Sequence, residues 1–195
     1  GRRSAFTWID SKDNLWLFGG LGFAESGERA YLNDLWKYNG SDWTWVSGHK
    51  WSRIFGNYGI KSVPDLANYP GSRGYGVSWI DSNDNLWLFG GYGFPASGIE
   101  AFRLNDLWKY DGTSWTWMSG STTINIDGEY GLKGIPTINN CPGSRDSSIS
   151  WIDSNDNLWL FGGYGYSEHT TDWHGMLLND LWKFDPDLRN IRIWI

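Results

Sequence analysis

The sequence predicts an all-β fold made of three copies of one repeating unit, and three observations support this prediction. Residues 79–91 recur almost unchanged at 8–20 and 151–163, and self-similarity at a fixed period is the signature of repeat architectures. The composition joins 16 Trp, 10 Tyr and 9 Phe to 26 Gly, a bias toward strand-forming aromatics and turn-forming glycine. Polar turn clusters separate short apolar runs, as they do between strands.

The whole interval repeats, because Trp8 and Trp79 are 71 residues apart and Trp79 and Trp151 are 72 apart. This period exceeds the roughly 40 to 50 residues of most propeller repeats. The excess lies in two connections of 23 residues each, 48–70 and 120–142. A long loop in a compact array is either functional or disordered, and a pattern common to both connections argues for order. The shared residues are Tyr58, Lys61 and Pro64 in the first connection and Tyr130, Lys133 and Pro136 in the second.

The sequence of each unit predicts four short strands, and their pattern is clearest in the middle unit. Strand 75–81 leads into the turn 82–85, where Asn and Asp side chains can hydrogen-bond their own backbone. Strand 86–89 is apolar at every position, which is typical of a strand covered on both faces, so we expect the sheets to stack. Strands 107–110 and 115–118 complete the unit.

The last predicted strand alternates large aromatic residues with Thr. It reads Trp43-Thr-Trp45 in the first unit and Trp115-Thr-Trp117 in the second, as expected of a strand with one buried face. The third unit departs here, since residues 187–194 lack this pattern. We expect the Trp side chains of the strands to pack within and between the sheets.

A Gly-Gly pair ends the second strand of each unit, where missing side chains permit positive φ or a close backbone approach. The chain then makes an excursion that differs in length and composition between units, over 21–31, 92–103 and 164–177. Variable loops on constant strands are typical of a binding face. We therefore expect function first in these loops.

With Gly-Gly ending one strand, Tyr110 in the next, Trp117 after six further residues and Arg73 opening the unit, the sequence resembles the kelch repeat over nearly the whole chain. The resemblance implies a β-propeller, in which four-stranded blades surround a central channel, often with about six or seven blades. It also implies structural roles for the repeated Arg, Gly-Gly, Tyr and Trp residues. These are Arg2, Arg73, Arg145, Gly19, Gly20, Gly90, Gly91, Gly162, Gly163, Tyr38, Tyr110, Trp45 and Trp117.

Three blades are expected, at 1–47, 71–119 and 143–195, with the two connections between them and a degenerate last strand in the third blade. Three blades cannot close a ring, because about four is the minimum in such folds. We interpret the chain, which opens at Gly1 inside a repeat element, as a segment of a larger propeller. The alternative is completion in trans, for example by two three-blade halves.

The excursion of the third unit carries the candidate ligand-binding residues. Tyr and Trp rings can stack on the apolar face of a sugar while polar groups take its hydroxyls. The two His residues would need a carboxylate to hold a metal ion and no Cys joins them, so we predict no metal site. Simple loop packing is the alternative interpretation. The candidates are Tyr164, Tyr166, His169, Asp172, Trp173 and His174.

Two other polar clusters have a structural interpretation. Residues 81–85 resemble a calcium loop, but they lack the glycine and the downstream Glu of an EF-hand, so we interpret them as a hairpin turn. Asn105 and Asp106 precede a strand and have counterparts in the other units. We expect them to bond loop backbone or to pair with the repeated arginines, with ligand contact as the alternative.

Charge and composition exclude several classes of partner. A net charge of −6 without any Lys/Arg run argues against nucleic acid. No apolar run approaches the roughly 20 residues of a membrane span, so no membrane insertion is expected. The single Cys141 cannot form an intramolecular disulfide and leaves the compartment open.

An extracellular or cell-surface setting is favoured by two features. Asn39-Gly-Ser41 matches the acceptor pattern for N-glycosylation. The Gly-rich and Asn-rich form of the repeat also resembles the kelch repeats of large secreted or surface proteins of microbes.

Catalysis has little support, because no Gly-x-Ser-x-Gly or other nucleophile context occurs. Galactose oxidase is a kelch-type enzyme whose copper site needs a cysteine linked to a tyrosine, and Cys141 precedes Pro142 in a connection, outside such a context. We therefore predict a non-catalytic module without a cofactor that binds a protein, a glycan or further blades or subunits. The alternatives are a building block of an extracellular filament or surface layer and, third, part of a galactose-oxidase-like enzyme.

Overall fold

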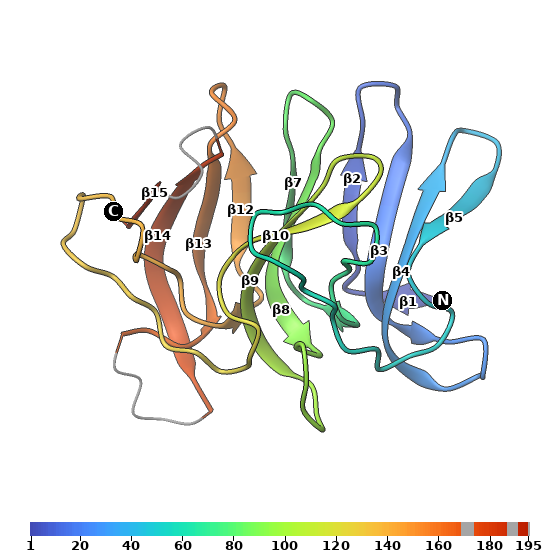
Figure 1. The fold of residues 1–195 in the computed structure, drawn as a ribbon, viewed down its shortest axis with the longest axis horizontal. Coiled ribbons are helices and arrows are strands. Elements are labelled where there is room, and N and C mark those ends of the chain that lie inside the picture. The colour runs from blue at the N-terminus through green and yellow to red at the C-terminus, as the bar shows by residue number, and fades with distance from the viewer. Residues whose placement is uncertain (169–173, 187–190, 195) are drawn as a thin grey trace.

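The predicted all-β class is confirmed for the part of the chain that the structure describes. The computed structural model describes residues 1–168, residues 174–186 and the backbone of residues 191–194. Fifteen strands in these ranges form three antiparallel sheets, one from each unit. The sheets stand side by side in chain order (Figure 1).

The central sheet shows the plan of all three. Its three longer strands pair in sequence, and the two short strands at its other edge both pair with β8. The short strands are therefore one edge strand, interrupted where the backbone of Tyr75 turns into the left-handed region with a φ of 63°. The five elements are β6 (Arg73–Gly74), β7 (Val77–Ile80), β8 (Leu86–Gly93), β9 (Phe102–Tyr110) and β10 (Trp115–Ser119).

The outer sheets repeat this plan, including the interrupted edge strand, with Ser4 and Ser147 at positive φ in place of Tyr75. The third unit keeps a fourth strand although it lacks the Trp-Thr-Trp pattern, because β15 pairs with β14. The first sheet comprises β1 (Arg2–Arg3), β2 (Phe6–Ile9), β3 (Leu15–Phe23), β4 (Arg29–Tyr38) and β5 (Trp43–Ser47). The third comprises β11 (Arg145–Asp146), β12 (Ile149–Ile152), β13 (Leu158–Gly165), β14 (Met176–Asp185) and β15 (Ile191–Trp194).

The strands extend further into the variable excursions than the sequence predicts. In the central unit β8 continues through the Gly-Gly pair to Gly93, and β9 begins at Phe102 instead of Leu107. A register shift between Phe89 and Gly91 accommodates the two glycines within the ladder. The loop proper is therefore 94–101, and both ends of the predicted excursion 92–103 belong to the sheet.

Each sheet has two apolar faces, which we call the forward face, toward the next unit, and the rear face, toward the preceding unit. One core cluster joins the forward face of the first sheet to the rear face of the second, and another joins the second to the third in the same way. The forward faces carry Phe6, Trp8 and Phe18, then Val77, Trp79 and Phe89, then Ile149, Trp151 and Phe161. The rear faces carry Leu15, Leu17 and Trp43, then Leu86, Leu88 and Trp115, then Leu158, Leu160 and Trp182.

Three strand Trp residues differ from the expectation that such side chains pack in the core. Trp43 and Trp45 of the first sheet and Trp151 of the third are exposed. They lie on the rear face of the first sheet and the forward face of the third, which no described unit covers. Their exposure thus follows from their place at the two ends of the array.

The connections are ordered and lie against the sheet that follows them in the chain (Figure 1). In the first connection, the amide of Ser62 donates to the carbonyl of Trp117 at 2.8 Å, and the Lys61 ammonium lies 4.5 Å from the centre of the same Trp ring. Asp65 forms an isolated bridge with Trp115. Each unit is therefore tied to the next by polypeptide as well as by apolar packing.

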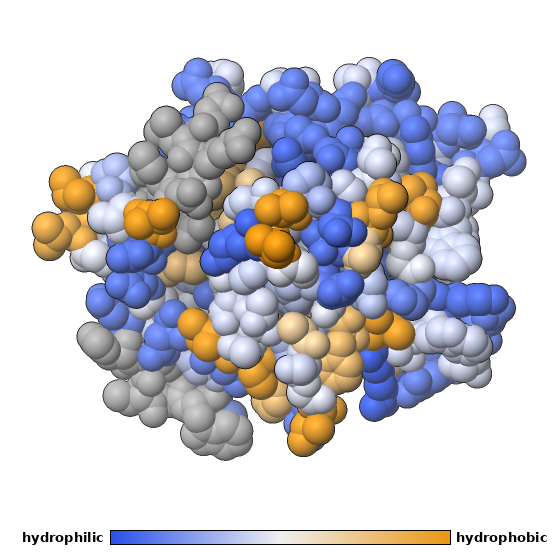
Figure 2. All heavy atoms as spheres, in the orientation of Figure 1, coloured by the Kyte–Doolittle hydropathy of each residue, from blue (hydrophilic) through white to orange (hydrophobic). Residues whose placement is uncertain are grey.

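In contrast to the apolar faces of the sheets, the hairpins that join the first and second strands of each unit are polar. These turns hold Asp, Ser and Asn, and the upper edge of the molecule that they form is mostly hydrophilic (Figure 2). The loops after the Gly-Gly pairs lie at the opposite, lower edge (Figure 1). The two ends of the sheets therefore present different surfaces.

Gly90 shows why the Gly-Gly pairs are needed. Its φ is 61°, and a Cβ there would lie 2.9 Å from the carbonyl oxygens of Leu104 and of Arg145 in the next unit. Gly162 has a φ of 62°, yet a Cβ there would meet only the Leu178 oxygen of its own sheet at 2.9 Å. Gly90 thus serves both the turn of its strand and the approach of the neighbouring unit.

Gly90→Ala is expected to destabilise the protein more than Gly162→Ala does. Both substitutions incur about 1–2 kcal/mol for a side chain in the left-handed region, but only the first also displaces the backbone of the neighbouring unit. Urea denaturation of the two variants measures the difference. Equal losses would show that the contact between units at Gly90 is not constraining.

Candidate functional site

Three of the six sequence-predicted ligand residues lie within the described part of the chain, and they differ in secondary structure and in exposure. Tyr164 belongs to strand β13 and pairs with Leu177, so its assignment to a loop is wrong. Tyr166 is buried with 5% of its surface exposed, whereas His174 is exposed. His169, Asp172 and Trp173 lie outside the described residues.

Tyr164 belongs to a row of residues that crosses each sheet beside the Gly-Gly pair. The row joins the edge strand, the second strand and the third strand at the same register. In the row on one side, a glycine of the second strand pairs with a leucine of the third strand in all units. In the row on the other side, an arginine and a glycine recur, but the third-strand residue is Ala30, Phe102 or Met176. The row between them holds a different set of residues in each unit. It reads Arg3, Leu21 and Tyr31 in the first sheet, Gly74, Tyr92 and Arg103 in the second, and Asp146, Tyr164 and Leu177 in the third.

Arg103 is the centre of the contacts that this row makes between sheets. Its Nε donates to Asp146 of the third unit at 2.8 Å, and its Nη1 donates to the carbonyl of His174 at 2.9 Å. The guanidinium lies 4.5 Å from the ring centre of Tyr164 and 5.9 Å from that of Tyr92. One cation therefore joins two aromatic rings and a carboxylate from two units.

Tyr31 brings the first unit into the same group. Its ring lies 5.9 Å from that of Tyr92 and 6.5 Å from that of Tyr75. Burial, the two neighbouring tyrosines and the Asp146 carboxylate raise the pKa of the Tyr31 hydroxyl to about 12. The phenol therefore stays protonated and able to donate a hydrogen bond at physiological pH.

Tyr75 stands where the edge strand is interrupted, and its backbone links the units. The Tyr75 amide donates to the Ser4 carbonyl at 3.0 Å, and the Ser147 amide donates to the Tyr75 carbonyl at 2.8 Å. Positive φ at a bulky non-glycine residue is unusual and marks a constrained position. We call Tyr31, Tyr75, Tyr92, Arg103, Asp146 and Tyr164 the tyrosine–arginine cluster; all six are partly exposed.

The fold is similar to that of YjhT. The two structures superpose with a TM-score of 0.57 at 16% sequence identity, over 100% of this chain and 51% of YjhT. This likeness concerns the fold alone, and it places the three stacked sheets in a propeller-like fold. The chain spans about half the length of YjhT. No known family profile matches the sequence.

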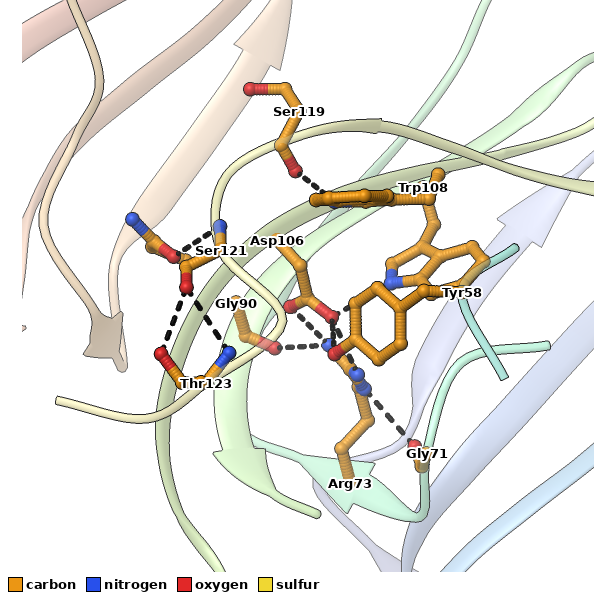
Figure 3. A network of polar contacts seen from close by, with 11 residues as sticks. Tyr58, Gly71, Arg73, Gly90, Asp106, Trp108, Ser119, Ser121 and Thr123 are labelled. Carbon is orange, nitrogen blue, oxygen red and sulfur yellow. Dashed lines mark hydrogen bonds and ion pairs between the residues drawn. The ribbon is translucent and has the colours of Figure 1, made fainter. Parts of the chain in front are cut away.

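An Arg–Asp ion pair recurs in each unit; it is buried in the second and third units and partly exposed in the first, and Figure 3 shows the central one. Arg73 and Asp106 are fully buried and meet in a bidentate pair at 2.6 and 2.8 Å. The Trp108 indole and the Tyr58 hydroxyl donate to the same carboxylate at 2.7 and 2.6 Å. Arg73 also donates to the carbonyls of Gly71 and Gly90 (Figure 3).

The role of Tyr58 was missing from the sequence-based expectation, although the recurrence of Tyr at the same place in both connections was a signal for it. Burial and the adjacent Asp106 carboxylate hold the pKa of the Tyr58 hydroxyl well above its ordinary value. In the next unit Tyr130 donates to Asp180 at 2.6 Å in the same way. Each connection therefore supplies a hydrogen bond to the ion pair of the unit that follows.

In the acidic hairpins, the first Asp carboxylate accepts hydrogen bonds from groups of the same hairpin and from a strand Trp. Asp81 Oδ1 accepts from the Asn83 amide and from the amide and side chain of Asn85 at 2.9 to 3.0 Å, and its Oδ2 accepts from the Trp87 indole at 2.8 Å. Within residues 1–168 and 174–186, no three His, Cys, Asp or Glu side chains gather where they could hold a metal ion.

Other sequence features lie apart from the tyrosine–arginine cluster. Asn39 is exposed in the turn between β4 and β5, where its Oδ1 accepts from the amides of Ser41 and Asp42. Cys141 is half-buried in the second connection, where its Sγ accepts from the Asn105 side chain at 3.5 Å. None of the described segments forms a helix with the length and apolarity that a membrane crossing requires.

Tyr58→Phe is expected to lower the free energy of unfolding by about 1.5–3 kcal/mol, the range for a hydrogen bond to a charged group. Tyr69→Phe, in the same connection but half-exposed, is the matched control and should change stability by less than about 0.5 kcal/mol. Urea denaturation compares them. Similar values for the two variants would contradict the role given to Tyr58.

Acid is expected to destabilise the hairpins between pH 3.8 and about pH 2. Burial works to raise the pKa of Asp10, but hydrogen bonds from Trp16, Asn14 and Lys12 outweigh it and lower the pKa to about 2. Hydrogen bonds from Trp159 and Asn157 likewise lower the pKa of Asp153 to about 2.

A carboxyl group with a depressed pKa stabilises the fold fully above its unfolded pKa, and this contribution is lost as the pH falls through the folded pKa. Unfolding free energies measured across this window should therefore decrease with acid. Asp10→Asn should show a shallower decrease. The same slope in the variant would contradict the assignment.

Proposed function

We propose that the chain is a non-catalytic, kelch-type propeller segment that binds a glycan at the end of the sheets that carries the tyrosine–arginine cluster. The observation that supports this most is the variable row. The tryptophans, glycines and arginines that define the repeat recur in every unit, whereas the row beside the Gly-Gly pairs brings together a different set of side chains in each unit. In this row the tyrosines, Arg103 and Asp146 of the three units meet at one partly exposed surface.

The chemistry of the cluster suits a sugar. Half-exposed tyrosine rings offer apolar faces for stacking, and the Tyr31 hydroxyl, Arg103 and Asp146 offer donors and acceptors for hydroxyl groups. Arg103 and Asp146 already hold each other, so the polar groups are oriented before a ligand arrives. A protein ligand at the same surface is the other outcome that the experiment distinguishes.

The propeller-like fold, the Arg, Gly-Gly, Tyr and Trp pattern and the four-stranded plan support the kelch assignment. The exposed Asn39 turn is compatible with N-glycosylation and hence with an extracellular or cell-surface setting. In such a setting a glycan-binding surface would meet its ligands directly.

The test exchanges cluster residues for those of the sister units, which the same backbone position already tolerates. Tyr75→Ser, Tyr92→Leu and Arg103→Leu copy Ser4, Leu21 and Leu177. An array of immobilised oligosaccharides identifies a bound glycan, and each variant should then bind it at least about tenfold more weakly, the effect of losing one contact of about 1.4 kcal/mol.

Trp51→Leu is the control for this test, because Trp51 is an exposed aromatic residue of the first connection. It should bind like the unmodified chain. Undiminished binding by all three cluster variants would refute the site. Binding of a protein and of no oligosaccharide would refute the glycan assignment.

A further inference from the structure

The guanidinium of the tyrosine–arginine cluster has a donor that the fold does not use. Arg103 donates through Nε to Asp146 and through Nη1 to the carbonyl of His174. Its Nη2 has no hydrogen-bond acceptor among the residues that the structure describes. Arg73, the structural arginine of the same unit, instead donates through all three of its nitrogens. Arg103 therefore keeps one charged donor for a group outside the fold.

Three tyrosine hydroxyls of the cluster are unused in the same way. In the described part of the chain, the hydroxyls of Tyr31, Tyr75 and Tyr92 have no hydrogen-bond partner. Tyr58, which serves the fold, differs because its hydroxyl donates to a buried carboxylate. None of the three is among the unpartnered oxygens that are shut off from the surface, so all three hydroxyls are open to a ligand.

These unused donors lie close together. The Tyr31 ring lies 5.9 Å from the Tyr92 ring and 6.5 Å from the Tyr75 ring, and the Arg103 guanidinium lies 5.9 Å from the centre of the Tyr92 ring. Tyr75 and Tyr92 also act electrostatically on the Tyr31 hydroxyl, so the three phenol oxygens are near one another. The first and second units thus contribute one group of neighbouring donors.

The carboxylate of the cluster is already engaged. Asp146 accepts from the Arg103 Nε at one oxygen and from the Ser147 hydroxyl at the other, each at 2.8 Å. Its negative charge is balanced by Arg103. Arg3 stands in the same row of the first unit and adds a second cation, whose charge acts on the Tyr31 hydroxyl. The cluster therefore combines unused donors with a surplus of positive charge.

Such a group of donors suits an anion better than a neutral sugar hydroxyl. A hydroxyl donates a hydrogen bond as well as accepting, whereas an ionised carboxylate only accepts. Hydrogen bonds between a guanidinium and an anion are also shorter and stronger than those between neutral groups. We propose that Tyr31, Tyr75, Tyr92 and Arg103 form a subsite for a carboxylate or sulfate ester carried by a sugar. The inference rests on the proposed glycan-binding function and makes its ligand an acidic glycan.

The net charge of the chain helps to separate such a subsite from general attraction between charges. The chain carries a net charge of −6, and a protein of that sign repels polyanions over long distances. A preference for the charged form of a glycan therefore has to come from a local group of donors. Removal of a neutral donor such as a phenol hydroxyl then tests the subsite without any change of charge.

The test compares oligosaccharides that share a backbone and differ in charge. Oligogalacturonate is paired with its methyl ester, and dextran sulfate is paired with dextran, so that the two pairs distinguish a carboxylate from a sulfate ester. Titration calorimetry at constant ionic strength measures the affinities. In at least one pair the acidic member should bind at least about tenfold more tightly, a difference of about 1.4 kcal/mol.

Tyr31→Phe and Tyr92→Phe keep the rings and the charge but remove one donor each. Each should bind the acidic glycan at least about fivefold more weakly, as expected for losing a hydrogen bond to a charged group, and bind the neutral member as before. Tyr38→Phe is the matched control, because Tyr38 stands at the other end of β4 and its hydroxyl donates to the Gly40 carbonyl. It should bind both members like the unmodified chain, and circular dichroism checks that each variant is folded.

The outcomes separate this inference from the proposed function. Binding of neutral oligosaccharides alone, on the array or in these pairs, would overturn the anionic subsite and leave glycan binding intact. Undiminished binding of the acidic glycan by both cluster variants would also overturn the subsite. Binding of no oligosaccharide would refute the proposed function itself.

Discussion

The buried pair of Arg73 and Asp106 is the interaction on which the central unit depends. Two opposite charges removed from water are tolerated only when geometry and additional hydrogen bonds satisfy them. Here the Arg73 guanidinium binds the Asp106 carboxylate in a bidentate manner. It also donates to the backbone carbonyls of Gly71, which precedes Arg73 in the chain, and Gly90, which follows it. The edge strand, the Gly-Gly strand and the third strand are thereby held in one register, and the variable row lies directly beside it.

A comparison of the ion pairs of the first and second units shows how a preceding connection changes the burial and hydrogen bonding of the pair. Arg73 and Asp106 have no exposed side-chain surface, whereas Arg2 and Asp34 are 24% and 10% exposed. The central carboxylate receives a tyrosine hydroxyl from the preceding connection, and Asp34 receives only Arg2 and the Trp36 indole among the described residues. Identical sequence motifs therefore differ in burial according to what packs on them, which is also why Trp43 is exposed and Trp115 is not.

Much of the scaffold could be predicted from local sequence, because apolar runs, Asn/Asp turns and Gly-Gly pairs act through their own backbone and neighbours. The all-β class, the second strand 86–89 and its preceding turn follow in this way. The candidate site could not be predicted so directly. Tyr92 and Arg103 flank glycines and polar residues and look like loop, yet the ladder continues through them because each pairs across the strands. The Tyr58 hydroxyl hydrogen-bonds Asp106, which lies 48 residues later in the chain, and no local sequence pattern predicts a contact at that separation.

The position of Tyr58 in the connection has a consequence for biosynthesis. A chain leaves the ribosome from its N terminus, and domains form as they emerge. The tyrosine that completes the central ion pair comes 15 residues before Arg73 and 48 before Asp106, so it is present when the strands bearing those charges appear. The tyrosine hydroxyl that hydrogen-bonds the buried carboxylate of the second and third units thus comes from a segment synthesised before the strands that carry the ion pair. Assembly acquires a direction that matches the direction of synthesis.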